Sequence, residues 1–137
     1  MAYPTGSGSE VLKRTSMRQL GGTETYGTWW SIDFTVAQIS AQANHTVPAN
    51  HIITPISIVV CNTTATLYPF DMGVTPSGGT TIEMIKNQSV PAGDSFVWND
   101  KFVLYGGDAL LFRVNESSSG DDLDIYVSYI DQDWTTP

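Results

Sequence analysis

The sequence predicts an all-β fold, an antiparallel β-sandwich of jelly-roll-like form with an extended N-terminal arm. Short segments rich in β-branched and aromatic residues recur along the chain at intervals of about ten residues. Turn-forming Gly, Pro, Asn and Asp residues separate nearly all of these segments. No long segment has the apolar period of a helix, so a parallel sheet built from βαβ units is not expected.

The chain has 137 residues, which suits one domain with one core, and we expect two parts. Residues 1–25 should form the arm and residues 26–137 the sandwich. The start of the arm is rich in Gly, Ser and Pro, which favours an extended segment over residues 1–8. Residues 10–20 could form a short helix that ends at Gly21-Gly22. Its loosely spaced apolar residues are Val11, Leu12, Met17 and Leu20.

The first half of the sandwich contains three expected strands. Residues 29–39 alternate, with one side formed by Trp30, Ile32, Phe34 and Val36. Residues 52–61 form a β-branched run in which Pro55 indicates a bend or a sheet edge. Residues 66–74 form the third strand, where Pro69 restricts pairing, and a turn follows over residues 75–79.

The second half contains five shorter expected strands. Two of them cover residues 80–86 and 95–98. A tight hairpin turn over residues 98–101 should lead into a strand at 102–105, and Gly106-Gly107-Asp108 should turn the chain into 109–114. A polar loop over 116–122 precedes the last strand, 124–130. In that strand one face consists of Ile125, Val127 and Tyr129.

The charge distribution argues against nucleic acid as a partner. The net charge is −8 and the sequence pI is about 4.3, so phosphate backbones should be repelled. Charged residues make up only 15% of the chain, and nine of the fourteen acids lie from Asp94 onward. Three of the six basic residues lie near the start: Lys13, Arg14 and Arg18. They could form a solvated surface, or they could contact an acidic neighbouring subunit.

The sequence also argues against secretion and membrane insertion. The first nine residues lack the basic and apolar regions of a signal peptide, and no apolar run is long enough to cross a bilayer. The single cysteine, Cys61, lies in an apolar run, where a free thiol usually packs as a small hydrophobic group. Without an internal disulfide, folding in a reducing cytoplasm is expected.

No residue pattern predicts a catalytic centre or a cofactor, and we expect a protein that is not an enzyme. His45 and His51 flank one turn and could share a metal ion, or they could be exposed turn residues. A carboxylate cluster, Asp121, Asp122 and Asp124, could bind calcium, or it could be a solvated loop.

Aromatic residues near both termini are the stronger signal. Tyr26, Trp29 and Trp30 precede or begin the first expected strand, and Trp134 lies near the end. Such residues could cover the ends of the core, anchor a subunit interface or stack on a ligand.

Three segments resemble a known class of proteins: Val90-Pro91-Ala92-Gly93-Asp94, residues 101–110 (KFVLYGGDAL) and residues 124–130 (DIYVSYI). A similar "VPAG" turn, "L-x-x-GD-x-L" corner and closing "D-I/V-x-V-S" strand recur in small β-sandwich virion proteins of tailed bacteriophages. The resemblance covers roughly residues 46–131. It implies a protein made in the host cytoplasm that joins the virion and acts by binding, often as a symmetric homo-oligomer.

The resemblance favours a capsid decoration or cement protein that binds the major capsid protein, with a trimer as the favoured homo-oligomer. We expect Lys13, Arg14 and Arg18 to contact an acidic neighbour. Tyr26, Trp29 and Trp30 should supply an aromatic interface. The alternatives are a neck or tail component, and a carbohydrate-binding receptor-recognition module that uses Trp98, Trp134 or Tyr105 for stacking.

Overall fold

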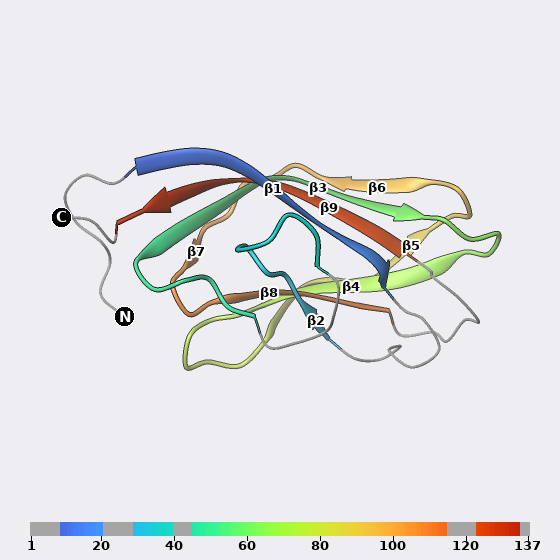
Figure 1. Cartoon of the computed structure of the whole chain (residues 1–137). Coiled ribbons are helices and arrows are strands. Elements are labelled where there is room, and N and C mark those ends of the chain that lie inside the picture. The colour runs from blue at the N-terminus through green and yellow to red at the C-terminus, as the bar shows by residue number, and fades with distance from the viewer. Residues whose placement is uncertain (1–8, 21–28, 40–44, 115–122, 135–137) are drawn as a thin grey trace.

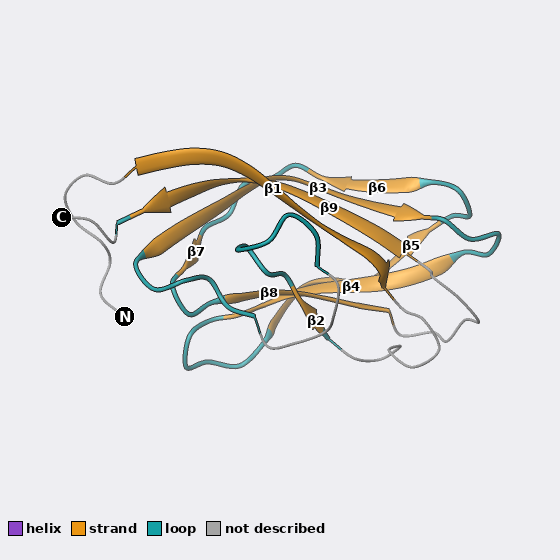
Figure 2. Cartoon of the chain, in the orientation of Figure 1, coloured by secondary structure: helices purple, strands orange, loops and turns teal. Residues whose placement is uncertain are grey.

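The computed structural model of the chain describes residues 9–20, 29–39, 45–114 and 123–134, and these residues form two antiparallel β-sheets packed face to face (Figure 1). The described residues contain strands and loops but no helix, as Figure 2 shows. None of them therefore belongs to a helix that could cross a membrane. The prediction of an all-β sandwich is confirmed.

The first sheet contains the long strands. Its order is β1 (Ser9–Leu20), β9 (Leu123–Asp133), β3 (His51–Asn62) and β6 (Ser95–Trp98), and β7 (Leu104–Tyr105) also pairs with β3. The second sheet has the order β2 (Trp30–Ser31), β8 (Ala109–Val114), β4 (Tyr68–Thr75) and β5 (Ile82–Val90). Figure 1 shows the first sheet above the second.

The helix expected over residues 10–20 is wrong, because this segment is strand β1. It pairs with β9 from Ser9↔Asp133 to Leu20↔Leu123. Its burial alternates with a period of two: Thr15 and Met17 are buried, whereas Arg14 is exposed. Part of the segment assigned to the arm is thus an integral strand of the first sheet. Residues 1–8 and 21–25 lie outside the described residues.

The strand expected over residues 29–39 is shorter than predicted. Only Trp30–Ser31 form a strand, which pairs with Phe112 and Leu111 of β8, and Ile39 forms an isolated bridge to Met17. The carboxylate of Asp33 accepts a hydrogen bond from the backbone N–H of Thr35 at 2.8 Å, a turn that diverts the chain from the sheet. Ile32 and Phe34 are nevertheless buried, whereas Val36 is exposed.

The hairpin expected at residues 98–101 is also wrong. Both β6 and β7 pair antiparallel with β3, β6 at Ile58–Cys61 and β7 at Ile52–Ile53. They are two parts of one interrupted edge strand. A β-bulge between Pro55 and Ser57 lies in the stretch of β3 between these pairings, so the bend or edge predicted from Pro55 is confirmed.

The core lies between the two sheets. Phe70 of β4 contacts Phe96 of β6 and Phe112 of β8, with ring centroids 5.5 Å and 6.5 Å apart, so aromatic rings connect the layers. The predicted inner face of the last strand is confirmed, since Ile125, Val127 and Tyr129 are all buried.

Candidate functional site

The structure does not bring the predicted binding residues together. Lys13 and Arg14 lie on β1 of the first sheet, whereas Trp29 and Trp30 lie at the second sheet. Trp30 packs against the core, and its buried indole Nε1 has no hydrogen-bond partner among the described residues. Arg18 belongs to β1, but its side chain is not described. Tyr26 lies outside the described residues.

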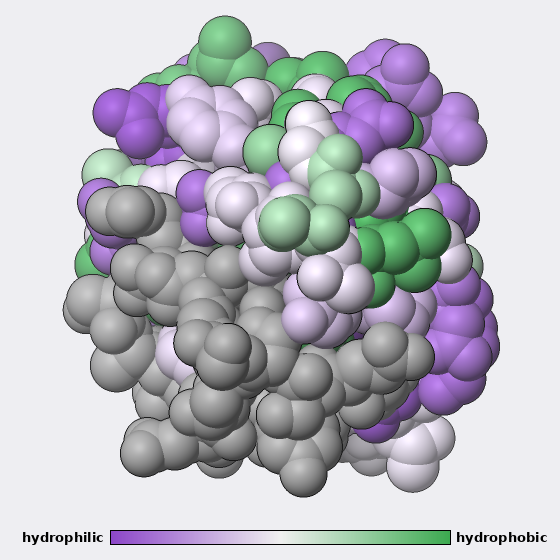
Figure 3. All heavy atoms as spheres, turned by 90° about the vertical axis from the view of Figure 1, so that its right-hand side faces the viewer, coloured by the Kyte–Doolittle hydropathy of each residue, from purple (hydrophilic) through white to green (hydrophobic). Residues whose placement is uncertain are grey.

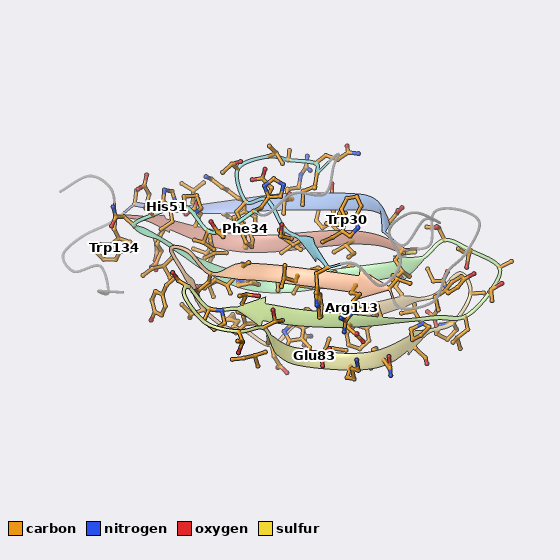
Figure 4. All side chains as sticks on the ribbon, turned by 90° about the horizontal axis from the view of Figure 1, so that it is seen from below. Trp30, Phe34, His51, Glu83, Arg113 and Trp134 are labelled. Carbon is orange, nitrogen blue, oxygen red and sulfur yellow. The ribbon has the colours of Figure 1, made fainter. Side chains whose placement is uncertain are left out.

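Lys13 forms an ion pair within the chain. Its Nζ lies 2.9 Å from Oδ2 of the buried Asp131, and Nδ1 of His51 lies 2.7 Å from Oδ1 of the same carboxylate. Asp131 thus joins three neighbouring strands at the end of the sandwich where Figure 4 places His51 and Trp134. Replacement of Lys13 by glutamate would set a second acid against Asp131. If Lys13→Glu weakened the binding of a partner, part of the effect would come from damage to the fold and not from a lost partner contact.

Tyr129 lies beside this ion pair. Its hydroxyl donates a buried hydrogen bond of 2.9 Å to the backbone oxygen of Phe34, and the two rings pack edge to face. Burial, and then the nearby Asp131 and Asp33 carboxylates, raises the pKa of Tyr129 to about 12 from its ordinary 10.0. The Tyr129 hydroxyl therefore stays neutral and connects the loop at Phe34 to β9 by its hydrogen bond.

This raised pKa predicts a loss of stability in alkali. The unfolded chain releases the Tyr129 proton near pH 10, whereas the folded chain keeps it until about pH 12. The stabilisation is thus fully present below pH 10 and is lost as the pH rises to 12, at about 1.4 kcal/mol per pH unit. Urea denaturation across this range should give a shallower decline for Tyr129→Phe than for the unsubstituted chain. Identical slopes would contradict the assignment.

A second buried carboxylate lies on the outer side of the second sheet. Asp71 of β4 is fully buried and accepts hydrogen bonds from Arg113 Nη2 at 2.7 Å and from the backbone N–H of Asn87 at 2.8 Å. Arg113 also lies 2.8 Å from Glu83, its neighbour in Figure 4, and its guanidinium lies 4.0 Å from the centroid of the Trp29 ring. This face is therefore occupied by a paired charge cluster, and Trp29 covers part of it.

Two grooves flank these clusters. One, of about 300 Å³, lies at the second sheet and is lined by Trp29, by the loop residues His45 and Thr46, and by Ala109 and Leu111 of β8. The other, of about 370 Å³, lies where Lys13, Arg14 and Tyr129 meet the loop at residues 34–37. Both are lined by mixed polar and apolar groups.

The two histidines contact different carboxylates. His45 Nδ1 lies 3.4 Å from Asp33, whereas His51 contacts Asp131 and Asp133. No three His, Cys, Asp or Glu residues in the described part of the chain are grouped as metal ligands would be. Asp121 and Asp122, proposed with Asp124 for calcium, lie outside that part. Cys61 is free and half-buried.

The residues proposed for sugar stacking have contacts of their own. Trp98 donates from Nε1 to the backbone oxygen of Asp100 at 2.8 Å, and its ring packs edge to face with Phe102. Trp134 donates its backbone N–H to the backbone oxygen of Asn50, and its buried indole Nε1 has no partner within the part of the chain that the structure describes. Tyr105 lies on β7 and is half-buried.

The outer face of the first sheet is the most distinctive surface. Because opposed residues point to the same side, the register places Tyr126, Val59 and Val97 in one row across β9, β3 and β6. Leu12 and Ile130 form a second apolar pair on this face. Leu12 is 72% exposed, Val97 54% and Tyr126 43%. In Figure 3 apolar residues gather along the upper margin, the side on which this sheet lies in Figure 1.

The charged side chains that the structure describes on this outer face lie at its border. Among the described residues that the register places there, Glu10 and Arg14 lie on the edge strand β1, and Asp124 lies near one end of β9. The guanidinium of Arg14 lies 5.9 Å from the ring centroid of Tyr126. An apolar and aromatic centre with charges at the border is the composition of a protein-binding surface.

Comparison with known proteins adds no relative: no family model matches the chain, and no curated protein matches it.

The sequence drew attention to Arg14 but not to Val59, Val97 or Tyr126. Their alternation within three separate strands was visible, but the pairing that aligns them in one row was not.

Proposed function

We propose that this chain is a non-catalytic structural protein of a tailed-phage virion, specifically a decoration or cement protein of the capsid. It acts by binding neighbouring capsid subunits through the outer face of its first sheet. The observation that carries the proposal is the uncharged centre of that face, formed by Val59, Val97 and Tyr126.

The strand order supports the proposal. With β6 and β7 counted as one interrupted edge strand, eight strands form two sheets of four, β1-β9-β3-β6 and β2-β8-β4-β5. Most consecutive strands lie in opposite sheets, as expected of a jelly roll. Jelly rolls are frequent in viral capsid proteins, although they also occur in lectins. The fold alone therefore does not determine the function, so the proposal rests on the properties of the surface.

The contrast between the two outer faces supports the same conclusion. On the second sheet the charges of Asp71, Arg113 and Glu83 are paired with one another within the chain. On the first sheet the centre consists of apolar and hydroxyl-bearing side chains that are partly exposed. A partner that covers the first face would bury apolar area without desolvating an unpaired charge.

The test is a substitution at the centre of this face. Tyr126→Asp should leave the fold intact, because Tyr126 is exposed, but should weaken binding to purified virions of the encoding phage by about 30-fold or more, as expected for an interface aromatic. The matched control is Ile82→Asp, which places the same charge at an exposed apolar residue of β5 and should leave binding unchanged. Equal affinities for Tyr126→Asp and the unsubstituted chain would refute the assignment of this face.

A further inference from the structure

The edge strand β1 is half covered by its own chain. Ile39 forms a parallel bridge with Met17, and its backbone N–H donates to the backbone oxygen of Ser16 at 2.7 Å. The side chain of Ser16 also donates to the backbone oxygen of Ala37. From Ser9 to Arg14, by contrast, β1 has backbone partners only on its β9 side among the described residues. An exposed edge of this kind is a template for a further strand.

The bridge at Ile39 fixes which backbone groups face this edge. In an antiparallel strand the N–H and C=O of alternate residues point to the same side. Because the C=O of Ser16 points away from β9, the backbone groups of Arg14, Leu12 and Glu10 point the same way. These three residues can therefore exchange pairs of hydrogen bonds with a strand added at the edge.

We propose that a second copy of this chain adds its own β1 antiparallel to this edge, across a two-fold axis centred on Leu12. Leu12 then lies opposite the partner's Leu12, and Glu10 lies opposite the partner's Arg14. Both pairs use the backbone groups that face the edge. The 72%-exposed Leu12 and the 49%-exposed Val11 lose solvent contact.

Charge selects this register. Glu10 and Arg14 are exposed and point to the outer face, so the symmetric pairing forms two equivalent Glu–Arg ion pairs on either side of the leucines. If the two-fold axis moved by one residue toward the C-terminus, Lys13 would lie opposite the partner's Lys13, which is repulsive. If the axis moved by one residue toward the N-terminus, Glu10 would lie opposite the partner's apolar Leu12 and both ion pairs would be lost. Glu10 already contacts Gln132, and Arg14 already contacts Tyr126. Both contacts are with β9, on the side of β1 opposite to the one where the partner strand would pair.

The consequence is a continuous sheet through two molecules, with their apolar outer faces side by side. The contact is a two-fold one, so it differs from the trimer that the sequence favoured. An edge contact of five residues from each strand is small, and the dimer should be concentration-dependent. This inference does not rest on the virion proposal, because it is tested on the purified chain alone.

Cysteine cross-linking tests the axis. In the Cys61→Ser background, Leu12→Cys places two thiols on hydrogen-bonded opposed residues, whose Cα atoms are about 5.5 Å apart, within disulfide range. Mild oxidation should give a disulfide-linked dimer at least tenfold faster than for Val97→Cys, an exposed apolar site on the opposite edge strand. Equal rates for the two variants would overturn the proposal.

A charge swap tests the register independently of any cross-link. Glu10→Arg and Arg14→Glu should each weaken dimerisation in sedimentation velocity by about tenfold, and the double variant should restore it. Glu10 and Arg14 are both exposed, so the fold should tolerate the two single variants and the double variant. A purified chain that stays monomeric at every concentration, that forms trimers, or whose double variant is no better than the single ones would contradict the proposal.

Discussion

Replacement of Asp71 by alanine should lower the free energy of unfolding by about 3 kcal/mol. The carboxylate is fully buried and accepts hydrogen bonds from Arg113, Lys86 and the backbone N–H of Asn87. Its removal leaves the largely buried guanidinium of Arg113 with one acid in place of two. It also leaves the N–H of Asn87 without its acceptor. Urea denaturation monitored by tryptophan fluorescence measures the difference.

Glu83→Ala is the matched control for this prediction. Glu83 contacts the same guanidinium at 2.8 Å, but its side chain is 37% exposed, so the loss should stay below about 1 kcal/mol. Similar losses from both variants would mean that the burial of Asp71 does not determine the strength of the cluster.

The second large effect should come from Phe70→Ala, at about 3–5 kcal/mol. Phe70 is fully buried and contacts Phe112 within its own sheet and Phe96 in the opposite sheet. The truncation therefore opens a cavity between the two layers. Differential scanning calorimetry should show the change as a large drop in Tm.

A double-mutant cycle of Phe70→Ala with Phe96→Ala isolates the contact between the sheets. We expect a coupling of about 0.5–1.5 kcal/mol, the range for aromatic pairs. Strict additivity of the two losses would show that the ring contact contributes nothing beyond apolar burial.

The sequence predicted the strands well where local signals were strong. Alternation and turn residues located β6 and β8 at the bounds that the structure has, and β3 within one residue at each end. The errors occurred where pairing decides the conformation. Residues 10–20 have weak local preferences and become a strand because β9 supplies a partner more than a hundred residues away.

The same reason limits prediction of the candidate surface. Lys13 was singled out for its charge, but its partner Asp131 lies 118 residues further along the chain. Arg14 was singled out as well, and it does lie at the border of the apolar outer face. Tyr126, Val59 and Val97 each look ordinary within their own strands. Only the register of β9, β3 and β6 makes them one surface.

The outer faces of the two sheets thus differ in their charges. The outer face of the second sheet pairs its charges internally around Asp71, which stabilises the fold. The outer face of the first sheet has an uncharged centre, and among the described residues its edge strand β1 pairs only with β9 from Ser9 to Arg14, so we propose that this sheet serves association. Tyr126→Asp tests the uncharged centre of the first sheet, and the charge swap at Glu10 and Arg14 tests its edge at β1.

The proposed virion role is tested most directly by quantitative mass spectrometry of purified virions of the phage that we propose as the source of the chain. We expect the chain to be present in a fixed ratio to the major capsid protein and to be retained through purification. A copy number sufficient only for a single ring would instead assign it to the neck or tail. Absence of the chain from purified virions would contradict the proposed function.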